Sequence, residues 1–387
     1  MRILILGGDG YLGWPTAMYL AARDHDVLVI DNYLRRRLAR ETRSEPLVPS
    51  DDLPTRCARF AALTGKHIAH RILDCTDGAA MIAAFADFAP EALVHYAEQP
   101  SAPYSMMGQD EAHLTLHNNL FTTFATIWAV KRAAPRCHIV KLASMGEYGT
   151  PNIDIEEGWI EIEHKGRKDR VLYPRAGGSV YHTSKIIDTD LLSFETRANG
   201  LRVTDLMQGP VYGHDTEEAA SDERLFPHFH YDDIFGTVLN RFVTQAVAGV
   251  PLTVYGKGSQ VRGYLDLRDT LQCVALVLAN PPAPGQLRVY NQFTELFTVL
   301  DLADRVRRVG RDLGLDVGIA AVPNPRREQE EHYYRPAHDG LLRLGLKPHY
   351  LSDERLASMV TFVRRHRDAI DARKILPRVA WPDQTDA

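Results

Sequence analysis

Tyr181 and Lys185 are the side chains of this sequence whose types and spacing most clearly suggest chemistry. They stand four residues apart within 179–194, which has helix-compatible content, so a helix would place both on one face. Ser144 directly follows a predicted strand at 138–142. An unperturbed phenol has a pKa of roughly 10 and is a poor base at neutral pH, but an adjacent ammonium favours its phenolate and a serine hydroxyl can bridge phenol and substrate. Ser144, Tyr181 and Lys185 together predict a site that removes a proton from a sugar hydroxyl while a hydride is transferred to a nicotinamide.

A glycine turn near the start of the chain forms a second candidate site. Gly7, Gly10 and Gly13 follow the first predicted strand and open a helix. Glycines there permit a tight turn, while the helix N-terminus presents N–H groups to a pyrophosphate. Asp31 ends the second predicted strand, near the offset of about 20 residues at which a carboxylate binds the adenosine ribose. A carboxylate repels a 2′-phosphate, so we predict NAD rather than NADP as the cofactor.

Two alternatives remain open at this turn. The glycines could form a plain strand-to-helix turn, and Arg35 and Arg36 could either belong to a solvated charge run or accept a 2′-phosphate. The predicted cofactor-binding set is Gly7, Gly10, Tyr11, Leu12, Gly13, Asp31, Asn32, Arg35, Arg36, Asp74, Cys75, Tyr181 and Lys185.

The elements that must position these residues alternate along the chain. Short apolar runs of strand type are separated by helix-compatible segments at 14–22, 79–88 and 118–133. This rhythm predicts an α/β protein with a Rossmann-type doubly wound parallel sheet and a smaller substrate-binding lobe. The expected NAD-binding core is 1–210 with later core segments at about 237–290, and the lobe comprises 211–236 and 291–387.

Composition excludes several classes of protein. The net charge is −5 without a long basic block, which argues against nucleic-acid binding. The four cysteines form no C-x-x-C pair, and neither His113 with His117, His228 with His230, nor 330–332 has a complete metal-ligand spacing, so no metal is expected. No apolar stretch is long enough to span a bilayer. We expect a cytoplasmic protein with a small-molecule substrate.

The combined motifs resemble the extended short-chain dehydrogenases/reductases, the superfamily that epimerises and dehydrates nucleotide sugars. Segments 208–213 and 262–269 resemble its substrate-side turn and the segment that supplies an arginine to the nucleotide diphosphate. Most of the chain resembles the UDP-sulfoquinovose synthase family more narrowly, through the runs at 7–11, 31–36, 101–106, 145–158, 252–258, 291–295 and 330–334. The resemblance implies a homodimer that binds UDP-glucose or a close relative, with substrate contacts from Gln99, Gln208, Arg262 and Arg326.

The family resemblance also implies a mechanism. Bound NAD oxidises the glucose C4 hydroxyl, the ketone acidifies the C5 hydrogen, the C6 hydroxyl is eliminated, sulfite adds at C6, and hydride returns to C4. Tyr181 is then the base, Lys185 its electrostatic partner, and Ser144 stands in place of a threonine. Ordinary 4,6-dehydratases have Thr-Asp-Glu at 144–146, where this chain has Ser-Met-Gly. His182 or Glu147 could replace the missing acid/base carboxylates, although His182 could equally be a hydrogen-bonded pocket residue.

Pro100 departs from the family pattern. The family has an arginine after Glu-Gln, and the resemblance suggests that this arginine contacts the reacting part of the substrate. Proline offers no charge for sulfite, so the chain is expected to act poorly on sulfite unless another arginine compensates. Two other functions remain open: a nucleotide-sugar 4-epimerase, and a catalytically silent NAD-sensing protein on the same fold.

Overall fold

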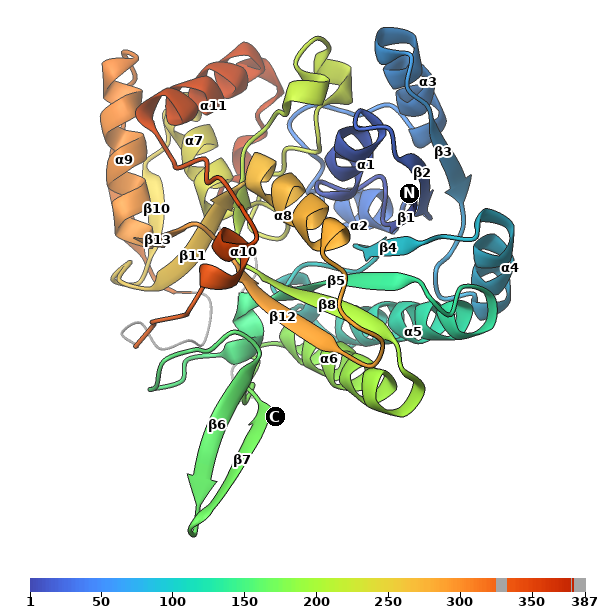
Figure 1. Ribbon diagram of the computed structural model, residues 1–387. Coiled ribbons are helices and arrows are strands. Elements are labelled where there is room, and N and C mark those ends of the chain that lie inside the picture. The colour runs from blue at the N-terminus through green and yellow to red at the C-terminus, as the bar shows by residue number, and fades with distance from the viewer. Residues whose placement is uncertain (325–332, 377, 379–387) are drawn as a thin grey trace.

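The computed structural model describes residues 1–324, 333–376 and 378. A seven-stranded sheet forms its centre, in the order β12-β8-β5-β4-β1-β2-β3 (Figure 1). Every neighbouring pair in this sheet is parallel, which confirms the predicted fold class. The strands are β1 (Arg2–Leu6), β2 (Asp26–Asp31), β3 (Ile68–Ile72), β4 (Ala92–His95), β5 (His138–Ser144), β8 (Arg202–Gln208) and β12 (Leu287–Gln292).

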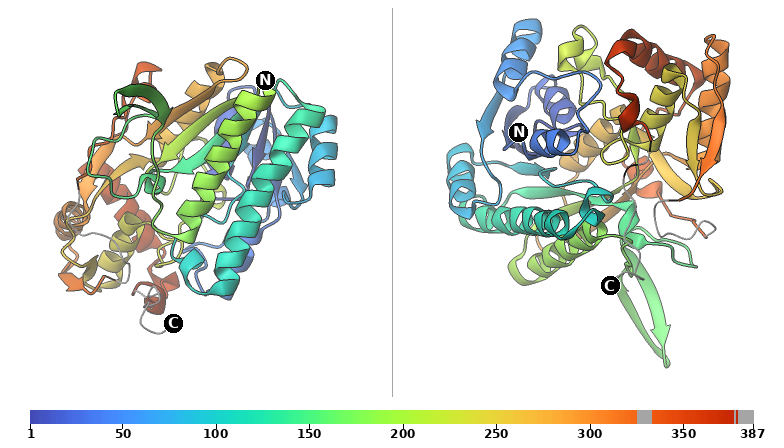
Figure 2. Two further views of the ribbon diagram at one scale, coloured as in Figure 1. Left: turned by 90° about the horizontal axis from the view of Figure 1, so that it is seen from below. Right: turned by 180° about the vertical axis from the view of Figure 1, so that it is seen from behind.

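Helices cover both faces of the sheet because its strands are apolar on both sides. Along β1, Leu4 and Leu6 pack into one hydrophobic cluster and Ile3 and Ile5 into another. The first cluster lies under three helices that run side by side (Figure 2): α4 (Gly78–Phe88), α5 (Gln109–Ala133) and α6 (Val180–Asn199). Around the opposite face and its edge lie α1 (Gly13–Ala21), α2 (Leu34–Glu41), α3 (Leu53–Thr64) and α8 (Leu267–Ala279).

A second lobe has its own hydrophobic core beside the sheet. Its helices are α7 (Val238–Ala248), α9 (Val299–Asp312) and α11 (Asp353–Arg365), and β10 (Leu252–Tyr255) pairs with β14 (Ile319–Val322). The structure thus groups 238–255 with the lobe rather than with the core, where the sequence analysis placed it. The reason is the amphipathic face of α7, whose Leu239, Phe242 and Val243 are buried against α9 and α11.

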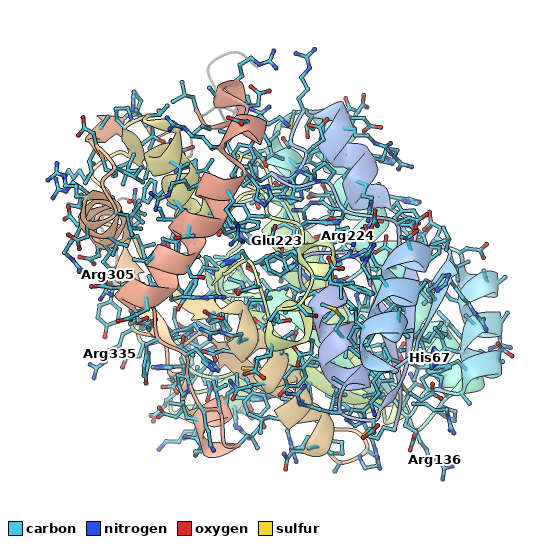
Figure 3. All side chains as sticks on the ribbon, turned by 90° about the horizontal axis from the view of Figure 1, so that it is seen from above. His67, Arg136, Glu223, Arg224, Arg305 and Arg335 are labelled. Carbon is cyan, nitrogen blue, oxygen red and sulfur yellow. The ribbon has the colours of Figure 1, made fainter. Side chains whose placement is uncertain are left out.

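Short elements join the two parts. The three-stranded sheet of β13 (Glu295–Thr298), β11 (Val261–Asp266) and β9 (Val211–Tyr212) lies between them, and α10 (Asp339–Arg343) packs near β12. Glu223, labelled in Figure 3, connects segment 211–236 to the lobe because its carboxylate pairs with Arg365 and His366.

A β-hairpin projects from the body of the molecule (Figure 1). It consists of β6 (Trp159–His164) and β7 (Arg167–Leu172), joined by Lys165 and Gly166 in left-handed conformations. The sequence analysis assigned no strand to 152–170, a stretch rich in charged residues. Its alternation of apolar and charged residues is typical of a strand, and a two-residue turn with two positive φ angles suits a hairpin.

Candidate active site

The turn between β1 and α1 has the close backbone packing of a dinucleotide cradle. Gly7 has a φ of +79°, and a Cβ there would come 2.7 Å from the backbone carbon of Tyr96. A Cβ on Gly13 would come 2.0 Å from the carbonyl oxygen of Gly7. Both positions therefore require glycine. No side chain of the described residues caps the start of α1. The N–H of Trp14 already donates to the carbonyl of Gly10 at 3.2 Å and residue 15 is a proline, so the N–H groups suited to an anion are those of the turn itself, before Trp14.

A cavity opens over this turn, at the carboxyl ends of the central strands. Ligands of open α/β sheets bind at this edge. The cavity continues past Tyr96, Glu98 and Pro100 after β4 to Leu142 on β5. Of the residues predicted to bind the cofactor, those that line it are Gly7, Gly10, Tyr11, Leu12, Gly13, Asp31, Asn32, Arg35 and Cys75.

Asp31 holds an ionised carboxylate in this cavity. Its Oδ2 accepts a hydrogen bond from the backbone N–H of Asp9 at 3.0 Å, and its Oδ1 accepts one from Tyr33 at 2.7 Å. Burial and the charge of Asp9 raise the pKa of Asp31 to about 6. The carboxylate is therefore charged at neutral pH and suited to accept hydrogen bonds from ribose hydroxyls.

The two arginines after β2 have different partners. Arg36 forms a bidentate pair with Asp9, with Nε–Oδ2 and Nη2–Oδ1 distances of 2.6 Å each, so its charge is directed to that carboxylate. Arg35 lines the cavity, with its guanidinium carbon 4.0 Å from the centroid of the Phe235 ring. Asp74 lies in the turn after β3, where Oδ1 accepts from the N–H of Thr76. Cofactor contacts by Arg36 and Asp74 stay predictions.

Helix α6 brings Tyr181 and Lys185 to the end of β5. Ser179 caps the helix, because its Oγ accepts from the N–H of His182 at 3.2 Å. The Nζ of Lys185 lies 5.9 Å from the centroid of the Tyr181 ring and donates to the carbonyl of Leu142, which lines the cofactor cavity. The two residues thus meet on one face of the helix, as their spacing predicts.

A buried carboxylate that the sequence analysis did not single out stands beside this pair. Glu98, with 3% of its side chain exposed, forms ion pairs with Lys185 through Oε2 and with Lys141 through Oε1. Lys141 in turn lies 3.1 Å from Asp188. The only signal in the sequence is an acidic residue three positions after a buried strand.

Glu98 changes the electrostatics of the reactive tyrosine. Burial raises the pKa of the Tyr181 phenol, and the charge of Glu98 raises it further. Burial lowers the pKa of Lys185 to about 8, although Glu98 opposes the fall. Because Lys185 is paired with a carboxylate, its ammonium alone does not make Tyr181 a phenolate. A further positive charge near the phenol is needed.

Ser144 and Glu147 lock the turn that follows β5. The Oγ of Ser144 accepts from the N–H of Gly146 at 3.1 Å, and the N–H of Ser144 donates to Oε1 of Glu147 at 2.9 Å. Burial raises the pKa of Glu147 to about 8, and its Oε2 lies 3.5 Å from a guanidinium nitrogen of Arg175. The carboxylate of Glu147 therefore points into the protein interior and is hydrogen-bonded to the backbone of the turn.

His182 lies against the glycine that replaces the dehydratase carboxylate. A Cβ on Gly146 would come 2.2 Å from Nε2 of His182, so the imidazole fills the space that a side chain at 146 would take. Its Nδ1 lies 3.0 Å from Oγ of Ser179. Of the two predicted substitutes for the missing carboxylates, His182 is the one whose ring lies against this position.

Two of the predicted substrate residues lie on neighbouring segments, because a Cβ on Gly209, next to Gln208, would come 2.0 Å from the carbonyl oxygen of Gly263, next to Arg262. Gln208 is also in register with Ser144 on the adjacent strand. The Gln99 amide is used internally, since it donates to Thr115 Oγ1 and the Ser101 carbonyl and accepts from the N–H of Ser101. Gln208 donates to Gln292 at 3.0 Å, and Arg262 lies on β11. Pro100 is exposed and lines the cavity. Arg326 lies outside the described residues.

The described part of the chain has neither a cluster of metal ligands nor a membrane-spanning helix. Within 1–324, 333–376 and 378, no group of three or more His, Cys, Asp or Glu side chains is arranged to hold a metal ion. No helix among these residues is long and apolar enough to cross a membrane.

Comparison with known proteins defines the class first. Residues 3–291 match the model of the NAD dependent epimerase/dehydratase family, and the chain belongs to this family. This membership confirms the predicted superfamily, the predicted NAD dependence and the interpretation as an enzyme.

Individual relatives narrow the comparison. The chain is 49% identical to the chloroplastic UDP-sulfoquinovose synthase of Spinacia oleracea over 98% of its own length and 79% of the relative's. It is 43% identical to the UDP-sulfoquinovose synthase of Sulfolobus acidocaldarius over 98% of both chains. The UDP-glucose 4-epimerase of Bifidobacterium longum, solved with NAD+ and UDP, superposes with a TM-score of 0.71 at 20% identity, covering 96% of this chain and 100% of that one. The structural match supports the fold.

Proposed function

We propose that the protein modifies a UDP-glucose-like nucleotide sugar at C4, C5 and C6 in the manner of UDP-sulfoquinovose synthase. The observation that carries the proposal is near-complete coverage by two relatives of that name, at 49% and 43% identity, together with a Ser144–Tyr181–Lys185 set beside the cofactor cavity. NAD, when bound, supplies a hydride acceptor for the sugar C4 hydrogen and a positive charge beside the phenol. Because the hydride returns, NAD copurifies and is not consumed.

Each residue of the site has its own role in the reaction of the sugar. Tyr181 takes the proton of the C4 hydroxyl and returns it at the end of the cycle. The ammonium of Lys185 offsets the negative charge of Glu98 near the phenol. Ser144 orients the C4 oxygen from its fixed place at the end of β5. His182, at the position of the missing carboxylate, takes the C5 proton and donates a proton to the C6 oxygen, which leaves as water. Gln208 and Arg262 hold the nucleotide half.

Pro100 argues against efficient use of sulfite by this protein. It lines the cavity where the family's arginine would stand, and a desolvated charge-assisted hydrogen bond is worth ~1.5–3 kcal/mol, or a roughly tenfold to hundredfold effect on anion capture. We therefore expect this chain to bind and oxidise the nucleotide sugar but to incorporate sulfite poorly.

Mass spectrometry of the product with labelled sulfite tests this expectation. Pro100→Arg should raise the yield of sulfonated sugar above that of the wild type, and Pro100→Gln is the matched control without a charge. Efficient sulfonation by the unmodified protein would show that another group replaces the arginine, and would restore sulfite as the ordinary co-substrate.

We propose in addition that the protein is a homodimer. Helices α5 and α6 run side by side and expose large apolar side chains: Phe121, Phe124, Trp128, Ile187 and Phe194. Exposed apolar patches of this kind are typical of interfaces. Light scattering should give twice the mass of the chain, and Phe124→Asp with Phe194→Asp should give a monomer. A monomeric wild type would contradict the proposal.

The state of the cysteines supports a proposal about the compartment. Cys57, Cys75, Cys137 and Cys273 are all free and buried, as suits a reducing environment. We therefore propose a cytoplasmic location.

A further inference from the structure

Side chains from segment 226–240 contribute to the wall of the cavity that the glycine turn also lines. This segment begins more than two hundred residues after that turn, yet it lines the same cavity. Leu47 holds the segment from outside, because its N–H donates to the carbonyl of Phe229 at 2.9 Å. The contributing residues are His228, His230, Phe235, Thr237 and Asn240.

His230 has one nitrogen bound to the backbone and one without a partner. Its Nδ1 lies 2.8 Å from the carbonyl oxygen of Ser44. A carbonyl oxygen only accepts, so Nδ1 carries the proton. The residue is 3% exposed, and its Nε2 makes no hydrogen bond to any described residue. A buried polar atom without a partner is costly unless a ligand satisfies it.

The surroundings of His230 keep its ring neutral. Burial and the nearby charge of Arg35 lower its pKa, although Asp232, with Oδ2 3.6 Å from Nδ1, opposes the fall. The neighbouring ring of His228, 6.2 Å away between centroids, is also neutral, because burial and Arg56 lower its pKa. Phe235 packs edge-on against His230 at 5.6 Å and brings no charge. A neutral imidazole protonated at Nδ1 carries a lone pair on Nε2 and can only accept there.

We propose that His230 is a cofactor-binding residue whose Nε2 accepts a hydrogen bond from a ribose hydroxyl of bound NAD. A pyrophosphate oxygen has no proton to donate, so it would repel this nitrogen, whereas a ribose hydroxyl satisfies it. The inference rests on the NAD binding of the proposed function but on no property of the sugar substrate.

Two substitutions separate this role from a structural one. In His230→Asn the amide nitrogen takes the place of Nδ1 and keeps the bond to Ser44, while the atom at the position of Nε2 is lost. In His230→Gln the amide reaches the position of Nε2 instead. His214→Asn is the matched control, since His214 is also 3% exposed with an unpaired Nδ1, but its ring stacks on Phe362 in the lobe at 4.6 Å.

The experiment measures NAD dissociation from the purified protein and NAD affinity after its removal. His230→Asn should release NAD about tenfold faster and bind it about tenfold more weakly, His230→Gln should lie near the wild type, and His214→Asn should match it. Folding of each variant is checked by thermal unfolding without NAD. Equal NAD retention by folded His230→Asn and wild type would overturn the inference.

A second measurement needs no substitution that could impair folding. In histidine-labelled wild-type protein, the ¹⁵N resonance of the unprotonated Nε2 of His230 should move upfield when NAD is added, as for a nitrogen that gains a hydrogen bond. An unchanged resonance at saturating NAD would contradict the proposal. Wild-type protein that retains NAD but never oxidises a nucleotide sugar would overturn the proposed function and leave this inference standing.

Discussion

At the scale of a single residue, the protonation state of Asp31 makes the binding of NAD, and the preference for NAD over NADP, depend on pH. Its pKa of about 6 means that the carboxylate is charged above pH 6 and becomes protonated as the pH falls below it. Only the charged form accepts from ribose hydroxyls at both oxygens and repels a 2′-phosphate. The pairing of Arg36 with Asp9 supports the same preference for NAD over NADP. Of the two nearby arginines, Arg35 and Arg36, it commits Arg36 to a carboxylate rather than to a 2′-phosphate.

We predict that NAD affinity is highest above pH 6 and weakens as the pH falls through this value. Calorimetric titration of the NAD-free protein between pH 5 and pH 8 measures it. Asp31→Asn should remove the pH dependence and Asp31→Ala should narrow the preference for NAD over NADP. Asp52→Asn is the control, because Asp52 does not line the cavity and its hydrogen bonds to Thr55 lower its pKa further below this range. Equal affinities of the wild type for NAD and NADP would refute the role given to Asp31.

Residue types and spacing were enough to predict that Tyr181 and Lys185 lie together and that the glycine turn follows the first strand. Helices and strands have fixed periods, so residues at a known offset lie on the same face. Residue types and spacing did not predict Glu98. Its pairing with Lys185 depends on two segments, the loop after β4 and the N-terminal part of α6, meeting near the end of β5. No local pattern encodes that contact. The bonds of the Gln99 amide to Ser101 and Thr115 are equally absent from any local pattern, and its contact with the substrate stays a prediction.

At the scale of elements, α2 and α3 were not singled out, but the helices expected at 14–22, 79–88, 118–133 and 179–194 correspond to α1, α4, the C-terminal part of α5, and α6, so the arrangement around the central sheet was predictable. The assignment of 238–255 was not, since an amphipathic helix followed by a short strand suits either a core or a lobe. The packing of Phe242 and Val243 against α9 and α11 decided it. The hairpin β6–β7 was missed because its charges resemble those of a loop.

The hairpin allows a prediction about which elements the site needs. Residues 161–170 are exposed, and the cofactor cavity has none of them in its wall among the described residues. Replacing 161–170 with Asn-Gly should therefore leave NAD content and the melting temperature nearly unchanged. Absorbance of the bound cofactor and thermal unfolding check it. A large loss of either would mean that the hairpin supports the site.

At the scale of the whole molecule, the cavity predicted to bind the cofactor is lined by both the sheet and the segment that leads into the lobe. The glycine turn and Asp31 come from one, and His228, His230 and Asn240 from the other. The site is therefore complete only when both parts fold together. Such an arrangement suits a redox cofactor that is recycled within one turnover rather than exchanged.

The central claim is that the bound cofactor creates a C4 ketone that acidifies C5 of the sugar. Mass spectrometry of UDP-glucose recovered after incubation with the NAD-loaded protein in deuterium oxide tests it most directly. The account predicts uptake of one deuterium at C5 without net NADH. In Tyr181→Phe, NAD should remain bound while uptake falls by several orders of magnitude. NAD-loaded wild type that binds UDP-glucose yet leaves C5 unlabelled, or that converts it to the C4 epimer without exchange, would contradict the account.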